Sequence, residues 1–179
     1  MFRIIWSKMR NRLGREKAEM LDFKSCRKIL LSRGRKYIEK MDKSREQVVE
    51  SCKFLIKDDM VILTHSRSRN VLATMIKAAQ QGKHFKVYVT EAQPLCEGKR
   101  MFSDLRKYNI PCTLILDSAI SYIIEKIDAV LLGAEGIGTC NVATIANLKN
   151  KPVYVLVESF KFIRLIPLNN SSIPKEYLK

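Results

Sequence analysis

Apolar residues recur every three or four positions in the first third of the chain. From Phe23 to about Lys57 they include Cys26, Leu30, Ile38, Met41, Val48, Cys52 and Leu55. This spacing predicts helices that each carry one apolar stripe. Glycine destabilises a helix interior by about 1 kcal/mol, so the pair Arg33-Gly34 predicts a break or a close backbone contact, and the segment is interpreted as two consecutive helical pieces.

After Asp59 the pattern changes to short apolar runs that alternate with helix-like segments. The runs cover residues 60–65, 85–90, 112–117, 129–134 and 153–158, and the periodic segments between them cover 70–81, 98–108, 118–127 and 139–149. The runs are continuously apolar, as strands covered on both faces must be. The pattern therefore predicts an α/β fold, with repeated βαβ units around a parallel sheet of about five strands and helices on both faces.

Polar residues cluster where each predicted strand ends. These clusters are Thr64 to Arg69, Thr90 to Gln93, Asp117-Ser118, Gly133 to Gly136 and Glu158-Ser159. Ligands of open α/β sheets bind outside the carboxyl ends of the strands, so the clusters are expected to meet in one crevice. Ser68 and Ser118 are equally well explained as helix caps, whereas Arg67, Arg69 and Glu135 are not.

Several common catalytic motifs do not fit. The loop GAEGIGT at 133–139 follows the fourth strand and has Asn141 where a dinucleotide fingerprint needs glycine, and no P-loop lysine follows it. Ser66 follows His65 directly, and neighbouring strand residues point to opposite faces, so the two are badly placed as nucleophile and base. The chain contains no GxSxG nucleophile elbow. His65 is therefore interpreted as a hydrogen-bonded polar residue.

The charge of the chain is strongly positive, and most of the excess is N-terminal. The formal net charge is +15, and residues 1–57 hold 17 basic and 7 acidic groups. Such a segment can bind nucleic acid, an acidic membrane or an acidic protein, or it can simply be a solvated helix face. Charge alone does not distinguish these possibilities. No nucleic-acid motif and no apolar run of about 20 residues is present, so we expect neither direct nucleic-acid binding nor a membrane span.

The chain has five cysteines, an odd number, and no two of them are spaced as a CxxC pair. This usage predicts reduced thiols in the cytoplasm and no zinc site, because only two histidines are available to complete one. The first fifteen residues carry five basic and no acidic groups, which resembles a mitochondrial presequence only superficially because they contain little serine.

Four segments together resemble a known family. ILTHSRSRNVL, VYVTEAQP, LDSAISYIIEKIDAVLLGAEG and NKPVYVLVESFKFIRLIPLN are similar, in this order, to the family formed by the alpha, beta and delta subunits of translation initiation factor 2B, with the alpha branch the best match. The resemblance implies a basic unmatched leader over 1–20, a remnant of an N-terminal helical region over 21–57 and a Rossmann-like α/β domain over 58–179. It also implies that this domain is shortened at its C-terminus.

The same resemblance implies a pocket without isomerase chemistry. The family is related to isomerases of methylthioribose 1-phosphate and ribose 1,5-bisphosphate, whose catalytic Cys and Asp correspond here to Ser66 and Glu135. A serine hydroxyl has a far higher pKa than a thiol, so we expect no catalytic residue. We also expect no metal and no resident cofactor. A sugar phosphate is the one ligand implied, with Arg67, Arg69, Thr139 and Lys161 as candidate anion contacts. The family's longer loop after Gly136 is missing, which argues against phosphate binding.

By resemblance, the chain is expected to be a non-catalytic regulatory subunit in the cytoplasm. It would join the complex that exchanges guanine nucleotide on initiation factor 2, with the exchange chemistry on a different subunit. Expected partners are the other subunits of factor 2B, initiation factor 2 in its phosphorylated form, and a second copy in a homodimer. Lys and Arg residues between Arg27 and Arg45 would meet the phosphorylated factor. The alternative is a sugar-phosphate-binding protein or isomerase.

Overall fold

The structure is a computed structural model that describes the backbone of residues 23–134 and 137–162. Side-chain environments are described over residues 27–134 and 139–162. The chain divides into two compact units, residues 1–43 and 44–179, and each is described by itself.

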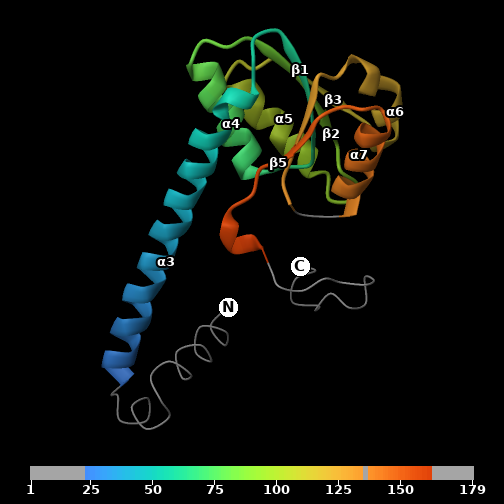
Figure 1. Cartoon of the computed structure of the whole chain (residues 1–179). Coiled ribbons are helices and arrows are strands. Elements are labelled where there is room, and N and C mark those ends of the chain that lie inside the picture. Colours follow the sequence, from blue (N-terminus) through green and yellow to red (C-terminus); the bar gives the residue numbers. More distant parts are fainter. Residues whose placement is uncertain (1–22, 135–136, 163–179) are drawn as a thin grey trace. The chain divides into compact units, whose positions relative to one another are not determined.

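The second unit is built on a five-stranded parallel sheet (Figure 1). Its strands are β1 (Met60–His65), β2 (Phe85–Thr90), β3 (Cys112–Ile115), β4 (Ala129–Leu132) and β5 (Val153–Val155), arranged in the order β3-β2-β1-β4-β5. In the register, Met60 lies opposite Phe85 and Ile62 opposite Ala129. The predicted α/β fold is confirmed. The order reverses between β1 and β4, where a ligand crevice is expected in such sheets.

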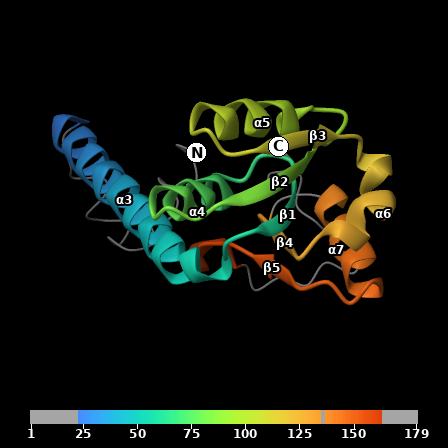
Figure 2. The ribbon, with the colours of Figure 1, turned by 90° about the horizontal axis from the view of Figure 1, so that it is seen from above.

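Helices cover both faces of this sheet (Figure 2). α4 (Arg69–Gln80) and α5 (Glu97–Lys107) pack on one face, with a core that includes Ile62, Met75, Val87 and Met101. α6 (Ile120–Ile123) and α7 (Ile137–Leu148) pack on the other, with a core that includes Leu63, Ile124, Val130 and Val142. Ile62 and Leu63 are neighbours in β1 and enter opposite cores, as alternation along a strand requires. This two-sided burial explains why the strands are continuously apolar.

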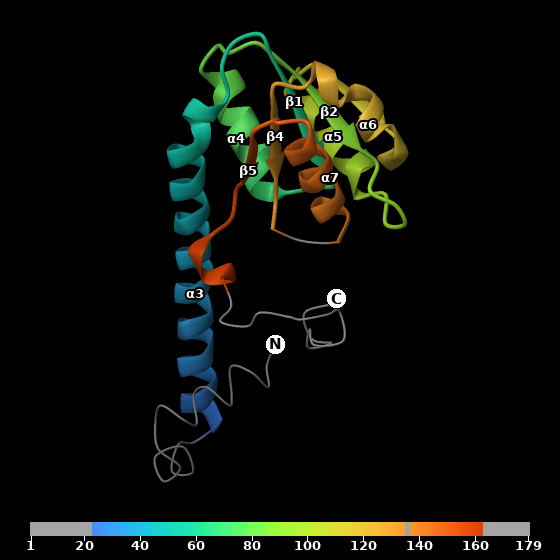
Figure 3. The same cartoon turned by 45° about the vertical axis from the view of Figure 1, so that its right-hand side comes forward.

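The N-terminal helix is continuous, so the predicted break at Arg33-Gly34 is wrong. α3 extends over Phe23–Cys52 and is followed by the short 3-10 helix η1 (Lys53–Leu55); Figure 3 shows α3 without interruption. A Cβ at Gly34 would meet nothing within 4 Å, so nothing forces the chain to turn there. One glycine destabilises the helix by about 1 kcal/mol, whereas a break leaves two sets of unpaired backbone groups and requires a second nucleation. No helix in the described ranges has the length and apolar character needed to cross a membrane.

The helices of the second unit begin and end partly as predicted. Ser68 caps α4, because its side chain accepts a hydrogen bond from the Val71 amide at 3.5 Å. Ser118 caps no helix, and the single helix predicted over 118–127 is wrong. The segment forms three short turns, η2 (Asp117–Ala119), α6 and η3 (Ile124–Lys126), which bury Ile120, Ile123, Ile124 and Ile127. β-branched isoleucines favour a regular helix only weakly, so their burial decides the local geometry.

Candidate functional site

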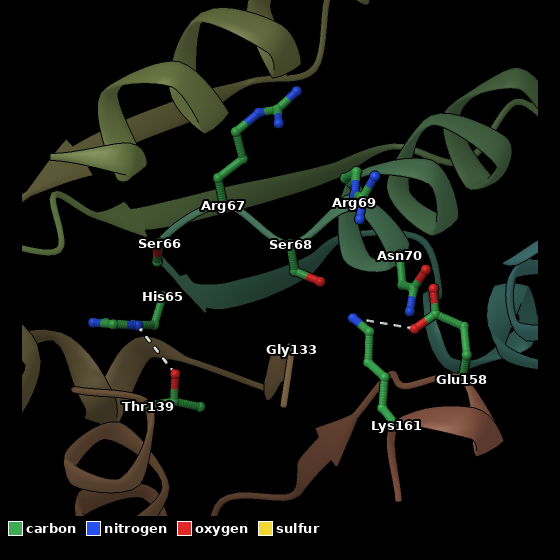
Figure 4. A pocket seen from close by; sticks show the side chains of 10 residues that line it. All are labelled: His65, Ser66, Arg67, Ser68, Arg69, Asn70, Gly133, Thr139, Glu158 and Lys161. Atoms are coloured by element: carbon green, nitrogen blue, oxygen red, sulfur yellow. Dashed lines mark hydrogen bonds and ion pairs between the residues drawn. The ribbon is translucent and has the colours of Figure 1, made fainter. Parts of the chain in front are cut away.

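A small cavity lies at the carboxyl ends of β1 and β4, at the point where the strand order reverses (Figure 4). Its volume is about 120 Å³. It is lined by residues from the end of β1 and the start of α4, from the ends of β4 and β5, and from the first turns of α7: His65, Ser66, Arg67, Ser68, Arg69, Asn70, Gly133, Thr139, Glu158 and Lys161. The position agrees with the crevice expected from the sheet topology.

The ends of β2 and β3 do not line this cavity, contrary to the expectation that all five strand ends meet there. Asp117, after β3, instead accepts hydrogen bonds from the backbone amides of Ala92 and Gln93 at 3.0 and 2.8 Å. These bonds join the loop after β2 to the end of β3. The two strands lie on the far side of β1 from the switch point, so their loops pair with each other.

Ser66 lies at the end of β1 in a strained backbone conformation. Its φ of 59° is in the left-handed region, which disfavours residues with a Cβ by about 1–2 kcal/mol. Its neighbour His65 faces Thr139, with 3.3 Å between Nδ1 of the ring and the threonine hydroxyl. Burial lowers the pKa of His65, although the carboxylate of Asp117 raises it in part. A largely neutral ring that is bonded to Thr139 agrees with the interpretation of His65 as a hydrogen-bonded polar residue.

Arg67 lines the cavity but is held from outside it. Its guanidinium contacts Asp104 Oδ2 on α5 through Nε at 3.0 Å and through Nη2 at 2.9 Å. Figure 4 shows the side chain directed away from His65 and Thr139. Asp104 also accepts a hydrogen bond from Lys107 at 3.1 Å. Lys107, with the larger effect, and Arg67 keep the pKa of Asp104 below its usual value. An anion in the cavity would have to compete with Asp104 for Arg67.

A buried carboxylate closes the opposite side of the cavity. Glu158 and Asn70 are each 3% exposed. Lys161 Nζ lies 3.2 Å from Glu158 Oε2 as an ion pair, and the Asn70 amide donates to the Leu156 carbonyl at 3.1 Å. Burial raises the pKa of Glu158. Hydrogen bonds from its own backbone amide and from Asn70, together with Lys161, lower the pKa by a larger amount, so the net shift is downward. Glu158 is therefore ionised at neutral pH.

The pairing of these groups leaves the cavity with little uncompensated positive charge. Arg67 is paired with Asp104, and Lys161 is paired with Glu158. Arg69, exposed in the first turn of α4, makes no ion pair with the residues that the structure describes. Within residues 27–134 and 139–162, no three His, Cys, Asp or Glu side chains are grouped as a metal site would require. Of the three cationic side chains that line the cavity, only Arg69 makes no ion pair within the described residues.

Five of the predicted site residues surround this one cavity: Ser66, Arg67, Arg69, Thr139 and Lys161. Glu135 lies outside the described residues. The sequence analysis did not identify Asn70 or Asp104 as site residues. No local signal marks Asp104, because it lies inside an amphipathic helix far along the chain from Arg67. Asn70 is the second residue of α4, where a polar residue is ordinary.

Comparison with known proteins decides the family. The chain matches the Initiation factor 2 subunit family over residues 4–177. The chain belongs to this family. It is 41% identical over 166 residues to translation initiation factor eIF2B subunit alpha of Caenorhabditis elegans, an alignment that covers 87% of this chain and 54% of that protein. It is 39% identical to the subunit of the same name from Dictyostelium discoideum, over 89% of this chain and 53% of that one.

More distant relatives of this chain are named as enzymes. Ribose 1,5-bisphosphate isomerase of Archaeoglobus fulgidus is 32% identical over 76% of this chain and 47% of its own length. Among solved structures, the Pyrococcus horikoshii translation initiation factor eIF-2B matches with a TM-score of 0.70 and 25% identity, over 80% of this chain and 60% of that chain. This chain spans about half the length of the curated relatives that it matches.

Proposed function

We propose that this protein acts as a non-catalytic regulatory subunit of the complex that exchanges guanine nucleotide on initiation factor 2. The observation that carries the proposal is the 41% identity to an eIF2B alpha subunit over 87% of the chain. In this role the chain would work in the cytoplasm and contact other factor 2B subunits. A solved structure of the family, the tetrameric eIF2B-beta2-delta2 complex of C. thermophilum, is an assembly of such subunits, and this chain matches it with a TM-score of 0.65.

The chemistry around Ser66 supports a role without catalysis. A serine hydroxyl needs an aligned base to act as a nucleophile or proton donor at neutral pH. The nearest histidine, His65, is bonded to Thr139, and its pKa is lowered by burial. The proposal also includes homodimerisation and recognition of phosphorylated initiation factor 2 by basic residues of α3, because Arg and Lys form charge-assisted hydrogen bonds with phosphate.

Co-expression with the other factor 2B subunits tests this role. We expect the tagged chain to co-purify with them, and we expect its addition to make nucleotide exchange more sensitive to phosphorylated initiation factor 2. The oligomeric mass of the isolated chain should correspond to a dimer. A monomer that retains no subunit, and that leaves the exchange rate unchanged with both forms of the factor, would refute the proposal.

The second candidate function is the binding of a sugar phosphate, favoured by Arg69 at a cavity between β1 and β4. The relatives named ribose 1,5-bisphosphate isomerase give this candidate its ligand class. Calorimetric titration with ribose 5-phosphate should show saturable binding that Arg69→Gln weakens. Arg100→Gln is the matched control, because Arg100 is 74% exposed and lies outside the cavity.

Turnover separates binding from catalysis in the same experiment. Conversion of ribose 1,5-bisphosphate that Ser66→Ala abolishes would establish an isomerase. Binding without conversion would establish a sensor. Equal affinity of the Arg69→Gln and Arg100→Gln variants would show that the cavity is not the binding site.

A further inference from the structure

The part of α3 within the first unit carries an apolar stripe that faces solvent. We call Leu30, Leu31, Tyr37, Ile38 and Met41 the helix stripe. Leu31, Tyr37 and Ile38 are 53%, 57% and 60% exposed, while Leu30 and Met41 are half-buried. At 100° per residue the five side chains fall within an arc of about 120°, the width of an apolar face that packs on another element.

The same side of α3 is a packing surface farther along the helix. Val48 and Cys52 continue the spacing of the helix stripe, and both pack against the core of the second unit. Large exposed side chains occur singly on most protein surfaces. Three of them aligned on one side of a helix, in continuation of residues that are packed, indicate a face that binds a partner.

Charge restricts the kind of partner. Residues 27–43 contain seven basic and two acidic residues. Arg33 lies along one border of the helix stripe, and Arg35 lies along the other beside Asp42, at angles given by the helical period. A second copy of α3 would bring these like charges together, which opposes self-association. A partner with Asp and Glu beside its apolar residues would gain from both contacts.

The geometry of α3 also restricts the shape of the partner. Residues 30–41 span about 17 Å, or three turns. The backbone hydrogen bonds of α3 are made within the helix, so it has no free edge that an extended strand could join. The backbone hydrogen bonds of a second helix are likewise made within that helix, so it can pack along the helix stripe through side-chain contacts alone.

We propose that the helix stripe binds an amphipathic helix of another protein whose apolar residues are flanked by Asp and Glu. This inference goes beyond the regulatory role and does not depend on it. The apolar contacts hold the complex together, and the basic borders select an acidic partner and speed its approach. An RNA would be attracted by the same cations but would leave Leu31 and Ile38 in water.

Fluorescence anisotropy with the full chain tests the proposal. The probe is a labelled helical peptide of about 20 residues with leucines at helical spacing and glutamates beside them. A twin peptide carries lysines in place of the glutamates. We expect saturable binding of the acidic peptide, no binding of the basic peptide, and weakening by salt.

Two variants of the chain locate the contact. Ile38→Gln should weaken binding of the acidic peptide by about tenfold or more, since it removes one buried side chain from the contact. Lys36 lies on the opposite side of α3, so Lys36→Gln should change the affinity for the acidic peptide by no more than about twofold. Equal far-UV circular dichroism of both variants would confirm that α3 is intact.

Four results would overturn the proposal. The first is no binding of the acidic peptide up to its solubility limit, and the second is equal affinity for the acidic and basic peptides. The third is an equal loss of affinity for the acidic peptide in the Ile38→Gln and Lys36→Gln variants. The fourth is displacement of the peptide by polyuridine, together with RNA binding that Ile38→Gln does not change. Sedimentation of the chain alone provides a further check. A dimer that Ile38→Gln converts to a monomer would show that a second copy occupies the stripe instead.

Discussion

Replacing Gly98 by alanine tests the close packing of α5 on the sheet. Gly98 is buried in the first turn of α5, and its amide donates to the Glu91 carbonyl at 3.1 Å. A Cβ at this position would lie 1.8 Å from the Thr90 carbonyl oxygen and 2.8 Å from Glu91 Cα. Both neighbours are backbone atoms at the end of β2, so no side-chain rotation can relieve the overlap.

The size of the overlap sets the expected loss of stability. The Cβ would be about 1.2 Å inside the 3.0 Å contact that real Cβ atoms do not cross, so α5 or the end of β2 must move by about that distance. Overpacking of a well-packed core destabilises by about 1–3 kcal/mol and sometimes more, and a backbone clash of this size lies at the upper end. We therefore expect Gly98→Ala to lower the free energy of unfolding by about 3 kcal/mol or more.

Urea denaturation measures this loss, and two other glycines provide controls. Gly82 has a φ of 82° and open space around it, so Gly82→Ala should destabilise by only about 1–2 kcal/mol through backbone strain. Gly34 lies inside α3 with nothing within 4 Å, so Gly34→Ala should increase helicity and stabilise by about 0.5–1 kcal/mol. A denaturation midpoint for Gly98→Ala equal to or above that of Gly82→Ala would refute the argument.

Three further predictions concern single positions. Ser66→Gly should stabilise the chain by about 1 kcal/mol because glycine relieves the strain at φ 59°, and an unchanged or lower urea midpoint would contradict this. Asn150, with φ 53° after α7, should tolerate glycine, whereas Asn150→Val should lower the melting temperature. The pKa of His65 is lowered on folding, so the unfolded chain binds its proton first; stability should fall as pH drops below about 6.5 until the folded pKa is passed. His65→Asn should reduce that slope in urea titrations between pH 7.5 and 5.5, and an unchanged slope would assign it to other groups.

Periodicity predicted the sheet well because burial on both faces leaves a strong signal in the sequence. β1 and β2 begin and end at the predicted residues, while β3, β4 and β5 begin as predicted and end two or three residues earlier. The prediction was weakest where two effects of similar size compete. In α3, the free energy gained by a continuous helix is larger than the cost of one glycine inside it. After Asp117, the burial of four isoleucines stabilises three short turns more than a regular helix would be stabilised.

Strand ends and sheet topology predicted which residues surround the cavity, but not its charge. The sequence places Arg67, Arg69 and Lys161 near one rim of a chain with a net charge of +15, which by itself predicts strong attraction of anions. The structure pairs Arg67 with Asp104 and Lys161 with Glu158, so a phosphate that contacted all three cations would have to replace a carboxylate at two of them. The paired residues Arg67 and Asp104 are 37 positions apart, with Arg67 in the loop between β1 and α4 and Asp104 inside α5, so only the folded chain reveals their contact. It follows that Asp104→Asn should release Arg67 and raise the affinity for inorganic phosphate, and that Lys107→Gln, which leaves the Arg67 contact in place, should not. Equal phosphate affinity of these two variants in calorimetry would show that Asp104 does not restrain Arg67.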